Sequence, residues 1–300
     1  MNWTLLLLVS TAITGTPIVL KALRSIKAKV FSIELLISIS LAGALFIGEY
    51  VEAAALSFLF ALGAYLEKAA LRRIRTAVHR QVGAQPHMAN PTTHERMMER
   101  LEEAQESEAS GQQFLQQFAR IYTPLIIGCS VLVYFLTHNV AQALTFLVIA
   151  CPGALVISVP ASLAAGLAKA ARHGIFMRDA AALEKLATVD PTIFQSPNTG
   201  EHYEAAGITI IMGTRPEPYL DDADIVVWSD QPADIQRAIN IARATVANMK
   251  QNTYFSLATV ALLLAGVFFG SIQMASGIFL HEMGILLVIL NALRLLRHGQ

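Results

Sequence analysis

The sequence predicts an α-helical multi-pass membrane protein of about seven transmembrane helices (six to eight) with a small cytosolic α/β remnant domain. Three observations lead to this class. The 300 residues are 54% hydrophobic and only 15% charged, and their mean hydropathy is +0.51. Soluble proteins are about 45–50% apolar and about 25% charged, so one soluble core of this size cannot hold the excess. The apolar residues also form bilayer-length stretches, and Lys and Arg cluster between alternate stretches.

The composition also excludes several classes of protein. The chain has 22 basic and 22 acidic residues, so no net positive field favours a nucleic-acid partner. Its two cysteines, Cys129 and Cys151, both lie in apolar runs and do not form a disulfide framework. An ordinary cytosolic enzyme, a disordered chain and a secreted disulfide scaffold are therefore excluded.

Bilayer-length apolar stretches define the expected spans. They are Trp3–Leu23, Val30–Ile47, Val51–Leu71, Phe118–Thr137, Ala141–Leu167, Thr253–Gly270 and Ala275–Leu296. No basic residue precedes the first run and no clean cleavage site follows it, so we expect a span rather than a signal peptide.

Basic residues set the expected orientation. They follow the first, third, fifth and last spans, beginning at Lys21, Arg72, Lys169 and Arg294. The intervening turns contain neither Lys nor Arg. The positive-inside rule then predicts a cell-membrane protein with its N-terminus outside and its C-terminus in the cytosol.

These spans divide the chain into five parts. Three transmembrane helices at 1–71 precede a cytosolic loop or helix at 72–117, and two further helices follow at 118–173. Short β-branched runs at Thr192–Phe194, Gly207–Met212 and Asp224–Trp228 indicate the α/β domain at 174–250. The last two helices are expected at 251–300.

An unusual tripeptide interrupts the fifth span. Pro152 removes a backbone hydrogen bond inside a helix, which frees carbonyl groups beside Cys151 and Gly153. A thiolate at such a break can bind a soft or borderline metal ion. A simple proline kink with a buried structural cysteine would give the same pattern.

Other ionisable residues at membrane depth are functional candidates because they are costly to bury in lipid. His281 and Glu282 in the last span can ligate zinc or cobalt, or they form a pair at the outer interface. Glu34 is a further candidate, with no role assigned by its position. Glu49 and Glu52 share one helix face, where they could line an ion exit path or favour a solvated helix start.

Several stretches together resemble the heavy-metal (class IB) P-type ATPases. Ala150–Ser158, which contains Cys151-Pro152-Gly153, resembles the metal-gating fourth core helix, and His281-Glu282 resembles the His-Glu element of the sixth. Phe46–Ala54 and Leu286–Arg294 also match the core of that family. The resemblance implies a divalent transition-metal substrate, with zinc or cobalt favoured, and implies metal ligands at Cys151, His281 and Glu282. It places Glu49, Glu52, Pro152 and Gly153 on the ion pathway.

The catalytic parts of the family are not recognisable. Gln195 stands where the phosphorylated aspartate is expected, and an amide cannot form an aspartyl-phosphate. The segments 72–117 and 174–250 are too short for the actuator domain and for complete nucleotide-binding and phosphorylation domains. We therefore expect a pseudo-ATPase without an ATP or magnesium site.

The sequence leaves four functions open. In the first, the chain binds or passively conducts a metal ion. In the second, it is a regulatory subunit for another membrane protein, such as a full-length metal pump, or it self-associates. The third is an active ATPase, and the fourth is a decayed or engineered fragment without activity. The expected partners are a metal ion and the lipid bilayer, with no nucleic acid.

Overall fold

The computed structural model describes residues 3–27, 33–82, 110–151, 153–190, 202–205, 207–213, 223–229 and 231–296. The chain divides into two compact units. The first unit comprises residues 1–68, 114–157 and 253–288, and the second comprises 69–113, 158–252 and 289–300. The predicted strand Thr192–Phe194 and the position Gln195 lie outside the described residues, as does Pro152.

The hydrophobic stretches form helices, as predicted. Before the sheet these are α1 (Trp3–Lys27), α2 (Ile33–Phe46), α3 (Tyr50–Val82), α5 (Ser110–Thr137), α6 (Val140–Ile149) and α7 (Gly153–Arg172). The last two are α9 (Pro232–Phe268) and α10 (Met274–Arg294). Among the described residues, four candidate spans meet the length and hydropathy of a membrane crossing, and three shorter apolar helices accompany them.

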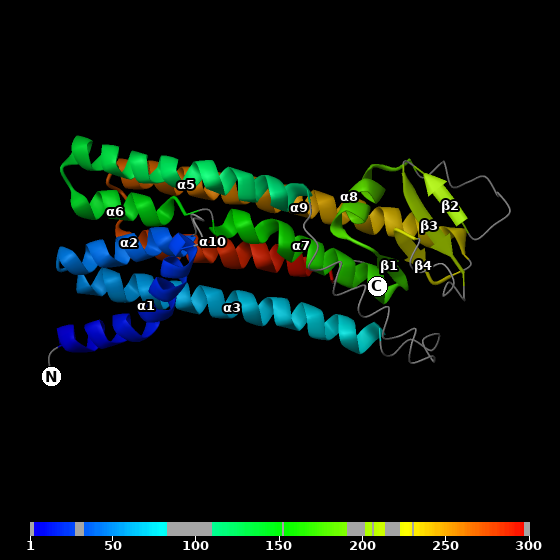
Figure 1. The fold of residues 1–300 in the computed structure, drawn as a ribbon, viewed down its shortest axis with the longest axis horizontal. Helices are drawn as coiled ribbons and strands as arrows, with labels where there is room; N and C mark the ends of the chain where they lie inside the picture. Colours follow the sequence, from blue (N-terminus) through cyan, green and yellow to red (C-terminus); the bar gives the residue numbers. More distant parts are fainter. Residues whose placement is uncertain are drawn as a thin grey trace. The chain divides into compact units, whose positions relative to one another are not determined.

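The expected fifth span differs from a single helix. It consists of α6 and α7, which the residues around Cys151 separate (Figure 1). The helix break predicted from Pro152 is therefore present, because α6 ends at Ile149 and α7 begins at Gly153.

Apolar side chains from many helices build the core of the first unit. One buried cluster joins Ile18 of α1, Ile37 and Leu41 of α2, Leu56 of α3 and Ile278 of α10. Glycines allow close helix contacts around it. A Cβ at Gly43 would lie 2.7 Å from the terminal methyl groups of Leu144, so glycine lets α2 and α6 approach without moving that side chain.

The second unit contains a four-stranded sheet in the order β1-β4-β3-β2. The strands are β1 (Ile175–Met177), β2 (His202–Ala205), β3 (Ile208–Met212) and β4 (Ile225–Val227). The β3 and β4 strands pair in parallel, while β1 with β4 and β2 with β3 are antiparallel. Helix α8 (Ala180–Thr188) is capped at its start by the Asp179 side chain, which accepts from the Ala182 N–H.

The strand predictions at Gly207–Met212 and Asp224–Trp228 are confirmed by β3 and β4. Two strands have no clear signal in the sequence: β1, a run of three residues directly after a helix, and β2, which starts with a histidine. Both strands pair with a neighbouring strand, β1 with β4 and β2 with β3.

Candidate metal site in the first unit

The helix break exposes carbonyl groups that find substitute partners. The Cys151 N–H bonds to the Val148 carbonyl at 3.1 Å, one residue closer than an α-helical bond. The Tyr122 hydroxyl on α5 donates to the Ala150 carbonyl at 2.8 Å. Cys151 is itself buried, with 3% of its surface exposed. The backbone at the break is therefore held by α6 through the Cys151 N–H and by α5 through the Ala150 carbonyl.

Gly153 brings two predicted ligands to one point. A Cβ built on this glycine would lie 3.4 Å from His281 Nε2, 4.0 Å from Cys151 Sγ and 3.2 Å from the Ile285 side chain. The missing side chain leaves open the side of α7 that faces α10. The predicted residues Cys151, Gly153 and His281 are thus neighbours, although they are distant in sequence.

His281 is buried without a hydrogen-bond partner among the described residues. Only 6% of its surface is exposed, and no described backbone or side-chain group bonds to its ring. The ring nitrogen Nε2 lies on the same side of Gly153 as the buried thiol, which makes it a candidate metal ligand. A neutral imidazole nitrogen is a good ligand for zinc-like ions.

Glu282 points to a different neighbour. Its carboxylate lies against Gly63 on α3, so closely that a Cβ at position 63 would overlap Oε2. Within the described residues, no group of three His, Cys, Asp or Glu side chains converges tightly enough to hold a metal ion. In this conformation Cys151 and His281 meet at Gly153, whereas Glu282 reaches toward α3.

A cavity of about 220 Å³ lies beside these residues. Its lining includes Gly63, Gly153 and Glu282, together with Glu34 at the start of α2. Lys21 of α1 lines it as well, and its Nζ lies 3.9 Å from Glu34 Oε1. The predicted candidate Glu34 therefore faces the same space as Glu282.

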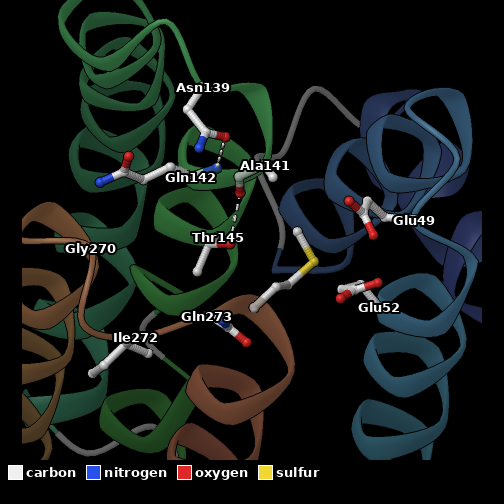
Figure 2. A pocket seen from close by; sticks show the side chains of 10 residues that line it. Glu49, Glu52, Asn139, Ala141, Gln142, Thr145, Gly270, Ile272 and Gln273 are labelled. Carbon is white, nitrogen blue, oxygen red and sulfur yellow. Dashed lines mark hydrogen bonds between the residues drawn. The ribbon is translucent and has the colours of Figure 1, made fainter.

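Glu49 and Glu52 line a second cavity of about 310 Å³, at the other end of α2 (Figure 2). Asn139, Gln142 and Gln273 add polar groups to its wall. Protonated Glu49 donates a hydrogen bond to the Glu52 carboxylate, and the charge of Glu52 repels ionised Glu49. Both effects raise the pKa of Glu49 above its usual value. The sequence places both residues on one helix face; Glu52 lies in the first turn of α3, and Glu49 directly precedes that helix.

Three contributors were missed from the sequence. Gly63 gives Glu282 its space, Tyr122 binds the freed carbonyl, and Lys21 pairs with Glu34. The sequence could have indicated Gly63, because a glycine within an apolar span often marks the close approach of a neighbouring helix. No sequence signal connects Tyr122 with residue 150.

The fold and the helix break are similar to those of heavy-metal P-type ATPases. No established family profile matches the chain. Similarity to particular relatives is limited to part of it. A zinc/cadmium/lead-transporting P-type ATPase of Escherichia coli is 39% identical over 114 residues, 35% of this chain and 16% of the relative.

A second relative gives similar coverage. A zinc-exporting P-type ATPase of Mycobacterium marinum is 34% identical over 112 residues, 37% of this chain and 15% of the relative. The matched segments thus span about a sixth of the curated relatives, 16% of the E. coli protein. The crystal structure of a zinc-transporting PIB-type ATPase in its E2·Pi state superposes with a TM-score of 0.63. That superposition covers 98% of this chain and 95% of the other at 18% identity, and so establishes the fold.

Proposed function

We propose that the chain binds a divalent transition-metal ion in the membrane and conducts it down its gradient without hydrolysing ATP. The observation that carries this proposal is the pairing of a buried thiol with a buried, unpaired imidazole at one glycine. A sulfur ligand and a nitrogen ligand suit zinc and cobalt better than the hard ions magnesium or calcium. Cys151 and His281 are the central ligands, and Glu282 completes the set by turning away from Gly63.

The names of the relatives agree with such a substrate. They are described as transporters of zinc, cadmium and lead, or of manganese. The carboxylates of Glu49 and Glu52 provide a place for the ion at the opposite end of α2. Pro152 and Gly153 contribute by keeping the fifth span open.

The absence of ATP hydrolysis rests on the sequence. Gln195 offers no carboxylate nucleophile, and the cytosolic segments are short. Without a phosphorylated intermediate there is no driven cycle, so the metal flux is passive. The positive-inside pattern supports a cell-membrane location with the C-terminus in the cytosol.

Uptake of zinc and cobalt into proteoliposomes tests the proposal. We expect uptake by the parent protein without ATP, no increase when ATP is added, and loss in Cys151→Ala and His281→Ala. Cys129→Ala is the matched control, because Cys129 is the other free cysteine and lies on α5. Equal uptake by the parent and Cys151→Ala would contradict the site, and uptake stimulated by ATP would contradict the passive mechanism.

A regulatory function is the second candidate, and the second unit favours it. Its sheet is fully built, with Ile175, Val226 and Ile210 each at most 1% exposed. A passive channel has no evident need for such a domain. Purification from native membranes distinguishes the two functions. A full-length metal pump that copurifies stoichiometrically, together with no uptake by the isolated chain, would favour regulation.

A further inference from the structure

The peptide unit that joins Ala150 to Cys151 is held at both of its polar groups. Its N–H, on Cys151, donates to the Val148 carbonyl at 3.1 Å. Its carbonyl, on Ala150, accepts from the Tyr122 hydroxyl of α5 at 2.8 Å. A peptide unit is planar, so hydrogen bonds at its two ends fix its orientation. The unit carries the proposed thiol ligand, and its orientation therefore affects where that thiol lies.

The Ala150 carbonyl needs a partner from outside its own helix. Helix α6 ends at Ile149, with Ala150 as its C-cap, so this carbonyl is one of those that a helix end leaves without an intrahelical donor. Ala150 is 0% exposed, so solvent cannot supply a donor. A side chain from a different helix, the Tyr122 hydroxyl, supplies it instead.

Packing holds the tyrosine ring in place for this hydrogen bond. Tyr122 packs against a buried cluster that consists of Leu36, Ile126, Leu147 and Ala150. The first three of these residues come from α2, α5 and α6. Because the ring is fixed by apolar contacts, its polar end reaches the carbonyl with little further loss of conformational freedom.

A free backbone carbonyl beside the thiol would change the ligand chemistry of the site. Carbonyl oxygens are hard ligands that suit manganese, magnesium and calcium, whereas thiolate and imidazole suit zinc. Ala150 directly precedes Cys151, so its oxygen is the backbone acceptor nearest in sequence to the thiol. The Tyr122 hydroxyl presents its positively polarised hydrogen to this oxygen, and that hydrogen opposes the approach of a cation.

We propose that Tyr122 is a specificity-determining residue that keeps the Ala150 carbonyl out of the ligand set, so that sulfur and nitrogen select a zinc-like ion over manganese. Tyr122 does not touch the ion and acts through the carbonyl. The inference rests on the proposed function, because it takes Cys151 and His281 as the ligands. It adds a means of discriminating between two ions of equal charge.

Competition between Zn²⁺ and Mn²⁺ for the purified full chain in detergent tests this inference. Tyr122→Phe removes the hydroxyl but keeps the ring, so it frees the carbonyl without deleting the packing. We expect the Kd for Mn²⁺ to fall about tenfold and the Kd for Zn²⁺ to change by less than about threefold. The ratio of the two constants is measured on folded sites alone, so partial unfolding of the variant does not alter it.

The matched control is Tyr134→Phe. Tyr134 lies on the same helix as Tyr122, but it is 40% exposed and its ring lies against Phe135. The control loses the same hydroxyl group from α5, and we expect it to keep the ratio of the parent protein.

The absorption spectrum of the cobalt(II)-loaded protein gives a second readout that a purely structural role would not move. An added oxygen ligand raises the coordination number, so the visible ligand-field bands of Co²⁺ should lose intensity in Tyr122→Phe. The sulfur-to-cobalt charge-transfer band should remain, because Cys151 is unchanged.

The outcomes separate this inference from the proposed function. A parent-like ratio in Tyr122→Phe, with zinc binding lost in Cys151→Ala, overturns the role of Tyr122 and leaves the proposed function intact. Equal weakening of zinc and manganese binding also overturns it, because the tyrosine then only supports packing. Retained zinc binding in Cys151→Ala, or no zinc binding by the parent, contradicts the proposed function itself.

Discussion

Three asparagines and a serine form a hydrogen-bonded network in the second unit, whereas the buried His281 of the first unit lies beside the open space at Gly153. In the second unit, Ser162 donates to Asn248 Oδ1 at 2.8 Å, and Asn252 Nδ2 donates to Ser162 at 3.0 Å. Asn291 donates to Asn252 Oδ1 at 2.9 Å, so α7, α9 and α10 are linked by one network. In the first unit, His281 has no such partner among the described residues.

This difference distinguishes two roles of buried polar side chains, a structural role and a ligand-binding role. A satisfied network costs little desolvation and fixes how helices pack, which is a structural role. An unsatisfied imidazole beside a thiol costs stability in the absence of a ligand, and a bound ion would recover that cost. The contrast therefore favours the first unit, rather than the second, as the place where an ion binds.

The largest expected effect comes from breaking the satisfied network. Asn248→Ala removes the acceptor of Ser162 and Asn252 and the donor to the Asn291 carbonyl. We expect the free energy of unfolding to fall by about 2–4 kcal/mol, because buried partners are left unpaired. Thermal unfolding in detergent measures it.

The matched control for that change is Asn240→Ala, since Asn240 is exposed on the same helix and accepts a hydrogen bond of 3.3 Å from Gln236. We expect the control to change stability by less than about 0.5 kcal/mol. Equal stability of Asn248→Ala and the parent would remove the contrast between the units. Zinc affinity of the folded fraction should be unchanged in both variants.

A smaller effect is expected from the glycine that makes room for Glu282. In Gly63→Ala the new Cβ excludes the position in which the carboxylate faces α3, so the turned-away conformation that binds metal is favoured. We expect zinc affinity to rise about tenfold with little change in helix content. Gly128→Ala is the control, because a Cβ there meets nothing within 4 Å. Zinc affinity that is the same in the two variants would show that the position of Glu282 is irrelevant to binding.

Much of the fold and of the candidate site is predictable from the sequence, and the failures have physical reasons. The apolar helices and the break at Cys151 follow from hydropathy and proline chemistry. Contacts between helices do not, because nothing local in the sequence connects Gly63 with Glu282 or Tyr122 with Ala150. Strand β1 was missed for the same reason, since its three residues depend on pairing with β4.

The smallest expected effect concerns pH and the second unit. Burial, followed by the charges of Arg237 and Lys169, lowers the pKa of His173 below its usual value of 6.5. The folded state therefore favours neutral His173. The stability that His173 contributes is complete above pH 6.5, and it is lost as the pH falls through the lower pKa of the folded state. Unfolding midpoints should therefore decline less on acidification in His173→Gln than in the parent. Identical pH profiles would contradict this assignment.

The central claim is that Cys151 and His281 bind one metal ion, and the absorption spectrum of the cobalt(II)-loaded protein tests it most directly. A sulfur-to-cobalt charge-transfer band should appear when Co²⁺ is added to the parent and to Cys129→Ala. The band should be absent in Cys151→Ala, and His281→Ala should weaken and shift the visible ligand-field bands. A charge-transfer band that persists in Cys151→Ala, or that never forms in the parent, would contradict the claim.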